Sequence, residues 1–319
     1  MGDASHPWRL SHVDEGSVTL TVAEPTEVRS LLASLVGSKA MAGRIMSRGG
    51  LERAGAMLRA GDALASGDEV CLRLATPDAR TDVSHGAVSV LFEDRVLLAA
   101  DKPAGILVHG DGRGAETLTA RVAGHLAREG RAAVPQAVQR LDTPTTGIVL
   151  FCLAEEFQPI LDAQVAGHGM RKRYLAVVEG RLAASERGWM RLEGPIARDR
   201  HDARRMRVGR TGKPALTLVR TVARRDGRAL LLVELWTGRR HQIRVHLAHE
   251  GHPIVGDELY GGARHADGLM LHAWSEEVRH PLTSEGLVLR TPFPARFGRL
   301  FDDAEHRAVE LQAGMRFDD

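Results

Sequence analysis

Hydrophobic and polar residues follow two different periods in the first part of the chain. Residues 18–22 alternate with the period of two that is typical of a half-buried strand, and residues 70–74 form a second short β-rich run. Residues 28–35 and 41–46 repeat apolar side chains at helical spacing instead. This pattern predicts a small N-terminal α+β domain over residues 1–75.

A polar segment, residues 76–87, has no apolar period and contains proline and glycine, which is typical of a linker. After it, β-rich runs dominate, and Leu118, Val122 and Leu126 mark a helix between them. Strands do not alternate strictly with helices, so we expect an α+β fold with a mixed, largely antiparallel sheet in a second domain over residues 88–319. The predicted strands are residues 88–92, 96–100, 147–152, 174–178, 216–222 and 230–235.

Composition narrows the class of protein. A length of 319 residues is typical of two domains, and a net charge of +2 excludes a polyelectrolyte of the histone kind. The two cysteines, Cys71 and Cys152, lie in apolar runs and are too few for a disulfide framework. The sequence has neither an apolar leader segment nor a run of 18 apolar residues. We therefore expect a cytoplasmic protein that does not enter a membrane.

Positive charge is concentrated in one segment. Residues 198–228 contain eleven Lys and Arg residues and three Asp residues. Neighbouring positive charges add their fields and attract phosphates. On charge alone, an RNA-contacting surface and an ordinary solvated surface remain equally good interpretations.

Signatures of the common cofactor enzymes are missing. Gly110, Gly112 and Gly114 are spaced too closely for a dinucleotide-binding loop, and Lys213 lacks the upstream glycine of a phosphate-binding loop. The sequence also has no G-x-S-x-G elbow and no C-x-x-C pair. It therefore predicts no nucleotide cofactor and no redox or serine-hydrolase chemistry.

Four histidines gather in one segment: His241, His246, His249 and His252. The zincin arrangement needs two histidines four residues apart with a glutamate after the first, and that arrangement is absent. Interleaved arginines would also repel a divalent cation. A metal-dependent hydrolase is therefore a weakly supported hypothesis, and no metal ligand is predicted.

A carboxylate in residues 138–150, VQRLDTPTTGIVL, has a more informative setting. Asp142 stands on a turn rich in hydroxyl groups, just ahead of a predicted strand, which would place it at a sheet edge and not inside the sheet. Taken alone, Asp142 fits an Asx-turn residue better than a catalytic residue.

Four segments follow one another along the second domain: VQRLDTPTTGIVL (138–150), KRYLAVVEG (172–180), TGRRHQIRVHLAHEGHPIVGDELYGG (237–262) and LHA (271–273). In this order they resemble the motif series of the RluA-type pseudouridine synthases, with further similarity in EDRVLLAADKPAGILVH (93–109) and MRVGRTGKPALT (206–217). The resemblance covers about residues 88–300, and its long TGRRHQIRVHL block is far more specific than a short pattern. It implies a bent mixed sheet crossed by a central RNA-binding cleft, with no metal or cofactor.

The resemblance implies a catalytic role for three residues. Asp142 falls where the family keeps its essential aspartate, Tyr174 where it keeps a tyrosine against the target base, and Arg244 where it keeps an arginine paired with the aspartate. Such an arginine would keep the carboxylate ionised and aimed at the ribose. Tyr260 belongs to the same signature, and we expect it to be structural.

The implied activity is isomerisation of specific uridines in rRNA or tRNA. The partner is then RNA, and the enzyme is expected to be monomeric. A target uridine must be turned out of its stack, and arginines would hold the surrounding phosphates. The arginines predicted to do so are Arg140, Arg204, Arg205, Arg207, Arg239 and Arg240.

Three positions depart from the family pattern. Gln139 stands where a histidine is usual, and Thr143 and Pro144 stand where charged residues are usual. These departures leave a second hypothesis open, an RNA-binding module of the same fold without catalysis. The first 75 residues weakly resemble a small RNA-binding fold shared with a ribosomal protein, but residues 1–80 carry nine basic and ten acidic side chains.

Overall fold

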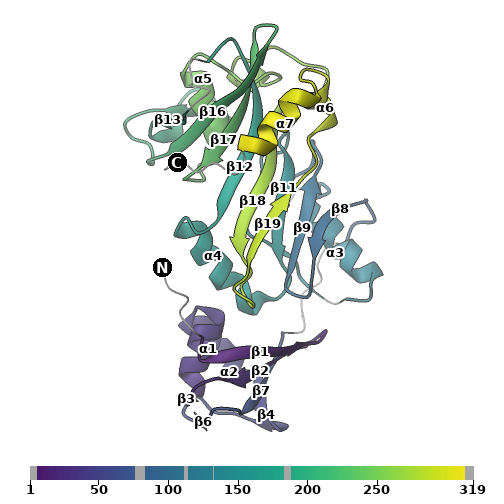
Figure 1. Ribbon diagram of the computed structural model, residues 1–319, viewed down its shortest axis with the longest axis vertical. Helices are drawn as coiled ribbons and strands as arrows, with labels where there is room; N and C mark the ends of the chain where they lie inside the picture. Colours follow the sequence, from purple (N-terminus) through teal and green to yellow (C-terminus); the bar gives the residue numbers. More distant parts are fainter. Residues whose placement is uncertain (1–5, 76–82, 111–113, 132, 183–187, 313–319) are drawn as a thin grey trace.

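The structure is a computed structural model that describes residues 6–75, 83–110, 114–131, 133–182 and 188–312 (Figure 1). Seven α-helices and two short 3-10 helices accompany mostly antiparallel sheets within these residues. In the same part of the chain, no helix has the length and apolar character that crossing a membrane requires.

The N-terminal part folds around a sheet of its own, with strand order β1-β2-β7-β4-β5. Two helices pack beside it at one end of the molecule (Figure 1). The strands are β1 (Trp8–Val13), β2 (Ser17–Val22), β4 (Leu51–Arg53), β5 (Ala56–Met57) and β7 (Glu69–Arg73), with the short pair β3 (Thr26–Glu27) and β6 (Ala63–Leu64), and the helices are α1 (Val28–Val36) and α2 (Lys39–Ser47).

Local sequence explains these elements. Buried and partly exposed side chains alternate along β2, as the period of two predicts. Helix α1 ends where Gly37 adopts a left-handed conformation with φ of 66°. Helix α2 begins at Ser38, whose hydroxyl accepts a hydrogen bond from the amide of Met41.

The C-terminal part is built on a ten-stranded sheet whose main path runs β13-β16-β17-β12-β18-β11-β9-β8, with β10 paired to β11 and β19 paired to β18. The only parallel pair in that path is β11 with β18. The strands are β8 (Ser89–Glu93), β9 (Leu97–Lys102), β10 (Gln136–Ala137), β11 (Thr146–Cys152), β12 (Arg171–Glu179), β13 (Met190–Glu193), β16 (Leu216–Arg225), β17 (Arg228–Leu235), β18 (Leu271–Arg279) and β19 (Gly286–Arg290).

The centre of this sheet depends on a glycine. Gly147 of β11 lies beside Ala273 of β18 and has a φ of 108°. A Cβ atom at residue 147 would lie 2.1 Å from the carbonyl oxygen of Ala273, so no other residue fits without moving the backbone. This close approach fixes the strand that follows the turn of Asp142.

Helices cover both ends of the large sheet (Figure 1). Leu118, Val122 and Leu126 of α3 are fully buried in its core, as their spacing predicts. A separate two-stranded ribbon carries part of the arginine-rich segment. These elements are α3 (Leu118–Arg128), α4 (Gln158–Ala166), α5 (Gln242–His249), α6 (Ala295–Gly298) and α7 (Asp303–Gln312), the 3-10 helices Glu155–Phe157 and Glu258–Tyr260, and the ribbon strands β14 (Ile196–Arg198) and β15 (Met206–Val208).

The predicted fold class is confirmed, since a mixed and largely antiparallel sheet with helices forms the larger part of the chain. The division into domains stays a prediction. Residues 76–82 of the expected linker lie outside the described residues. The end of that segment packs against α3, because the amide of Ser84 donates a hydrogen bond of 2.9 Å to the carbonyl of Ala120.

Candidate active site

A cleft of about 880 Å³ opens on the large sheet. Its walls come mainly from the turn before β11, the face of β12, and the segment that leads from β17 into α5, and the segment after β9, α4 and β18 also contribute. Asp142, Tyr174 and Arg244 all line it. The tertiary structure therefore brings the three predicted catalytic residues together.

Asp142 lies on the turn between β10 and β11, where the amide of Thr145 donates a hydrogen bond of 3.0 Å to its carbonyl. Its side chain is 25% exposed. Because β11 lies between β9 and β18, the turn stands at the end of an interior strand and not along an edge strand. The carboxylate thus faces the cleft while its backbone is anchored in the middle of the sheet.

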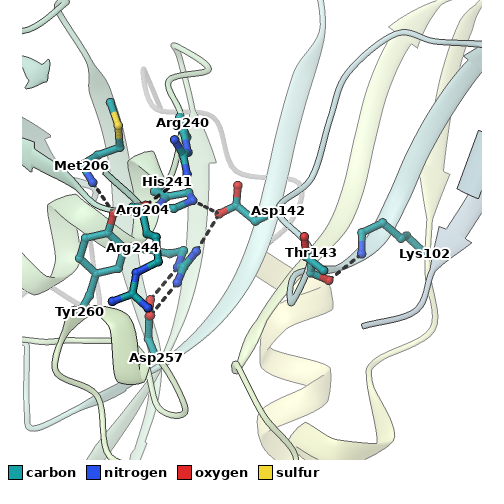
Figure 2. A network of polar contacts seen from close by, with 10 residues as sticks. All are labelled: Lys102, Asp142, Thr143, Arg204, Met206, Arg240, His241, Arg244, Asp257 and Tyr260. Carbon is teal, nitrogen blue, oxygen red and sulfur yellow. Dashed lines mark hydrogen bonds and ion pairs between the residues drawn. The ribbon is translucent and has the colours of Figure 1, made fainter. Parts of the chain in front are cut away.

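A buried lysine supports this turn from behind. The ammonium of Lys102, which has no exposed surface, donates to the carbonyls of Pro103, Ile106 and Thr143 at 2.9, 2.8 and 3.0 Å. Burial lowers the pKa of Lys102 to about 8, although the negative charge of Asp142 acts in the opposite direction. Figure 2 shows the lysine reaching the residue directly after Asp142.

Arg244 of α5 forms an ion pair with Asp142, the candidate catalytic residue. Its Nη1 donates to Oδ2 of Asp142 at 3.1 Å, as Figure 2 shows. No hydrogen bond from a described residue reaches the other carboxylate oxygen, Oδ1 of Asp142. One oxygen is therefore fixed by the guanidinium and the other is left for a substrate.

A second carboxylate fixes the arginine. Asp257, which is buried, accepts hydrogen bonds from Nε and Nη2 of Arg244 at 2.7 and 2.8 Å. Burial disfavours the charged guanidinium, but the hydrogen bonds and charge of Asp257 and the charge of Asp142 outweigh it and raise the pKa of Arg244. Because Asp257 accepts from Nε and Nη2 of Arg244, the guanidinium is oriented so that Nη1 donates to Asp142.

A tyrosine and a histidine pack around the pair. Nδ1 of His241 forms a hydrogen bond of 2.7 Å with the hydroxyl of Tyr260, and Nε2 of His241 lies 3.8 Å from Oδ2 of Asp142. The guanidinium of Arg244 lies over the ring of Tyr260, at 5.1 Å from its centroid. Burial lowers the pKa of His241, against the charge of Asp142, so the imidazole is neutral at neutral pH.

Tyr174 of β12 forms the floor of the cleft and is 5% exposed. Burial raises the pKa of Tyr174, and the charges of Glu276 and Asp142 raise it further. The ring therefore offers a neutral phenol and a flat apolar surface at neutral pH.

Gln139, one of the departures from the family pattern, has a definite partner. Its Nε2 donates to Oε1 of the buried Glu276 at 2.5 Å. Burial raises the pKa of Glu276 to about 8, although Lys172 and the hydrogen bond from Gln139 both lower it. Lys172 lies opposite Glu276 in the β12–β18 pairing and lines the cleft. Gln139 thus connects the Asp142 turn to the strand that runs beside Tyr174.

The predicted RNA-contacting arginines fall into two groups. Arg140, Arg239 and Arg240 line the cleft. The other three lie on or beside the ribbon: Arg204 pairs with Asp202 at 2.8 Å, and Arg205 lies over the ring of Tyr260. Arg207 belongs to β15. A bridge joins the two groups, because Nη2 of Arg240 donates to the carbonyl of Arg204 at 3.2 Å (Figure 2).

Three of the four clustered histidines form hydrogen bonds with protein groups, His241 with Tyr260 as described above. Both ring nitrogens of His246 are engaged, with Thr217 at 2.9 Å and the carbonyl of Gly194 at 3.0 Å. Nδ1 of His252 contacts the carbonyl of Glu179 at 2.9 Å. In the described part of the chain, the one group with ligand atoms close enough for a metal is Glu93, His125 and Glu129, which lies outside the cleft.

Sequence reasoning missed three residues of the site. Asp257 and His241 lie inside the quoted segment 237–262, and Lys102 lies inside 93–109. Their position in those segments could have marked them as candidates. The sequence did not indicate which side chain each of them would contact.

Comparison with known proteins points to one class of enzyme. The sequence profile described as RNA pseudouridylate synthase matches residues 96–249. The chain is 39% identical over 215 residues to a protein named uncharacterized RNA pseudouridine synthase YhcT from Bacillus subtilis, covering 66% of this chain and 70% of that protein. It is 36% identical over 265 residues to ribosomal large subunit pseudouridine synthase D from Xanthomonas campestris, covering 76% of this chain and 77% of the relative.

Solved structures share the fold. The human RNA Pseudouridylate Synthase Domain Containing 1 superposes with a TM-score of 0.56 at 23% identity, over 72% of this chain and 98% of the human chain. The human RNA Pseudouridylate Synthase Domain Containing 4 gives a TM-score of 0.53 at 21% identity, over 70% and 92% of the two chains. At these identities the comparison carries the fold alone.

Proposed function

This chain belongs to the RNA pseudouridylate synthase family, and we propose that its isomerase reaction, the conversion of uridine in RNA to pseudouridine, is carried out by Asp142. The observation that supports this assignment is the 3.1 Å contact from Arg244 to one oxygen of Asp142, with the second oxygen facing an open cleft. An ionised, oriented carboxylate is what the reaction requires.

The reaction conserves every atom of the nucleotide. The bond from N1 of uracil to C1′ of ribose breaks, the base turns while it is held, and a bond forms from C5 to C1′. Asp142 either attacks C1′ or removes the proton from C2′, and both routes need the carboxylate in its charged form. C5 then loses its proton and N1 takes one up, so uridine and pseudouridine have the same composition. Asp142 is regenerated because its bond to C1′ breaks as C5 bonds there, or because the proton that it removed returns to C2′. Arg244 keeps Asp142 charged, and Asp257 keeps Arg244 in position.

We assign Tyr174 to the base. Its flat face packs against the everted uracil. Because its pKa is raised, the phenol keeps its own proton at neutral pH, so it serves as a hydrogen-bond donor or a surface for the ring and not as a strong base.

We assign Arg140, Arg239 and Arg240 to the phosphates around the target, since they line the cleft. Arg204, Arg205 and Arg207 stand beside that path on the ribbon, where they extend its positive charge. We propose large-subunit rRNA as the substrate, because relatives from three bacteria carry that substrate in their names. The proposed working form is a cytoplasmic monomer.

The test replaces the carboxylate with its isosteric amide. Asp142→Asn should lower the release of tritium from RNA labelled at C5 of uracil by at least about 10²-fold, because the amide can neither attack nor accept a proton. Thermal unfolding and RNA affinity should change little, because carboxylate and amide have the same shape.

Asp14→Asn serves as the control, since Asp14 is exposed and lies outside the cleft. Appreciable turnover by the Asp142→Asn enzyme would reject the assignment of Asp142. Wild-type protein that binds RNA but releases no tritium would instead identify the inactive RNA-binding module. Mapping pseudouridine in cells with and without the gene distinguishes large-subunit rRNA from tRNA as the substrate.

A further inference from the structure

An exposed tryptophan lies between residues that line the cleft. Trp236 directly follows β17 and is 40% exposed, whereas Trp8 and Trp274 are buried. Its neighbours Leu235 and Gly238 both line the cleft. The amide of Trp236 donates to the carbonyl of Leu216 at 3.3 Å, so the backbone is fixed while the indole remains in contact with solvent.

A histidine from another element joins this tryptophan. The imidazole of His168 lies with its centroid 5.9 Å from that of Trp236, and the ring planes are inclined by 37°. His168 follows α4, whose residue Val165 also lines the cleft. Two aromatic rings therefore meet where α4 and the end of β17 border the cleft.

The backbone at His168 is unusual. Its φ of 58° is a left-handed conformation that is unfavourable for a residue with a Cβ atom relative to the ordinary helical one. Its imidazole makes no hydrogen bond or ion pair with any residue in the described ranges, so such a bond does not offset the cost. Strained positions of this kind concentrate at binding sites.

Basic residues line the cleft next to the segment that carries Trp236. Lys172 pairs with Leu235 across β12 and β17 and lines the cleft. Its ammonium makes no side-chain hydrogen bond or salt bridge with the residues that the structure describes, although it feels the charge of Glu276. Arg239 and Arg240 line the cleft a few residues beyond Trp236. Aromatic rings interleaved with cations are typical of surfaces that bind single-stranded nucleic acid.

We propose that Trp236 and His168 form a stacking platform for an unpaired base that neighbours the target uridine. The proposal rests on the proposed function, in which a uridine is turned out of its stack into the cleft. The adjacent base then loses a stacking partner, and an aromatic ring can replace it. Because every base has a flat face, the platform accepts any base and positions the strand without reading its sequence.

Base stacking can be separated from charge by the choice of probe. One probe is a fluorescent oligouridylate of eight nucleotides, and the other is a ribose–phosphate oligomer of the same length without bases. Trp236→Ala should weaken binding of the oligouridylate by about 5- to 150-fold, which corresponds to one stacked base. Binding of the oligomer without bases should stay unchanged.

Conservative variants and a control make the experiment specific. Trp236→Phe should restore most of the affinity, since it keeps a flat ring. His168→Asn should weaken oligouridylate binding several-fold, because asparagine accepts the left-handed backbone but has no aromatic ring. Val288→Ala on β19 removes an exposed apolar side chain outside the cleft and should change nothing.

Equal loss of affinity for the two probes, or no loss for either, would overturn the platform. Its failure is distinguishable from failure of the proposed function, because tritium release by each variant is measured separately. With saturating RNA, Trp236→Ala should keep its kcat and show a raised KM. A wild-type protein without turnover, but with base-dependent binding through Trp236, would reject the enzymatic role and leave the platform intact.

Discussion

At the scale of single residues, the site is a chain of contacts that ends on one carboxylate oxygen. Asp257 grips Arg244 by two hydrogen bonds, and Arg244 reaches Asp142 by one. Lys102 fixes the backbone on the other side of the same turn. Because each group is held by the next, the position of Asp142 is set before any substrate arrives, which is the condition for efficient acid–base or nucleophilic catalysis.

Lys102→Met tests the support behind the turn. Methionine has a similar length but leaves three carbonyls without their donor, so we expect the free energy of unfolding to fall by about 1–3 kcal/mol. Tritium release should also fall, because the turn that carries Asp142 loosens. Lys39→Met, an exposed position on α2, is the control and should match wild type in both measurements. Full stability in Lys102→Met would contradict the supporting role.

At the scale of elements, the adjacent strands β12 and β18 place two ionisable side chains next to each other. Lys172 of β12 and Glu276 of β18 lie directly opposite each other, and Gln139 connects Glu276 to the segment that precedes the Asp142 turn. A protonated Glu276 is the favoured form in the folded protein, because its pKa is raised to about 8 from the ordinary 4.5. The stability of the protein therefore depends on pH through this residue of the β12–β18 pairing.

The direction in which pH changes the stability follows from the raised pKa of Glu276. Between about pH 4.5 and 8 the folded state keeps the proton of Glu276 and the unfolded state releases it, so this group's contribution to stability is full below pH 4.5 and is lost as pH rises through 8. Glutamine at this position cannot ionise, so the stability of Glu276→Gln does not fall in this way as the pH rises. The variant should therefore gain a few kcal/mol relative to wild type, on the order expected for such a shift, when urea unfolding is compared at pH 5 and pH 8.

Glu277→Gln is the matched control for this measurement. Glu277 is the next residue of β18, is partly exposed, and pairs with Arg171 at 3.4 Å. Its stability profile should run parallel to that of wild type over the same pH range. A parallel profile for Glu276→Gln as well would mean that Glu276 is ionised in the folded protein, contrary to our expectation.

At the scale of the whole molecule, the N-terminal part is packed onto the catalytic part. One apolar cluster contains residues of both, among them Val36 and Leu72 on one side and Phe157 and Leu161 on the other. A salt bridge of 2.5 Å joins Arg48 of the N-terminal part to Glu156, whose side chain is 1% exposed. Arg44 also approaches the catalytic part, at 3.6 Å from Glu155. These two basic side chains of the N-terminal part are used for contacts within the chain.

Arg48→Ala tests this junction. It leaves the carboxylate of Glu156 buried with the amide of Ala75 as its remaining hydrogen-bond donor, so the free energy of unfolding should fall by about 3 kcal/mol. Arg44→Ala removes a pair whose arginine is 59% exposed and should cost about 1 kcal/mol or less. The double variant Arg48→Ala with Glu156→Gln should recover part of the loss. Equal effects of Arg44→Ala and Arg48→Ala would argue against a buried junction.

The sequence by itself determined the local structure and the identity of the chemistry. The period of two in β2 and the helical spacing of Leu118, Val122 and Leu126 reflect burial on one face, which is a local property of the chain. The motif series likewise predicted that Asp142 and Arg244 belong to one site, and their catalytic roles stay a proposal.

Only the tertiary structure decided which side chains meet. Asp142 and Arg244 are 102 positions apart, and their contact depends on how the turn before β11 and helix α5 come together. The pairing of Arg204 with Asp202 and its contact with Arg240 are likewise invisible in a charge count, and the role of Arg204 in RNA contact stays a prediction. The contact of His168 with Trp236 has no linear signature at all. Such contacts come from packing between distant segments, and periodicity carries no information about them.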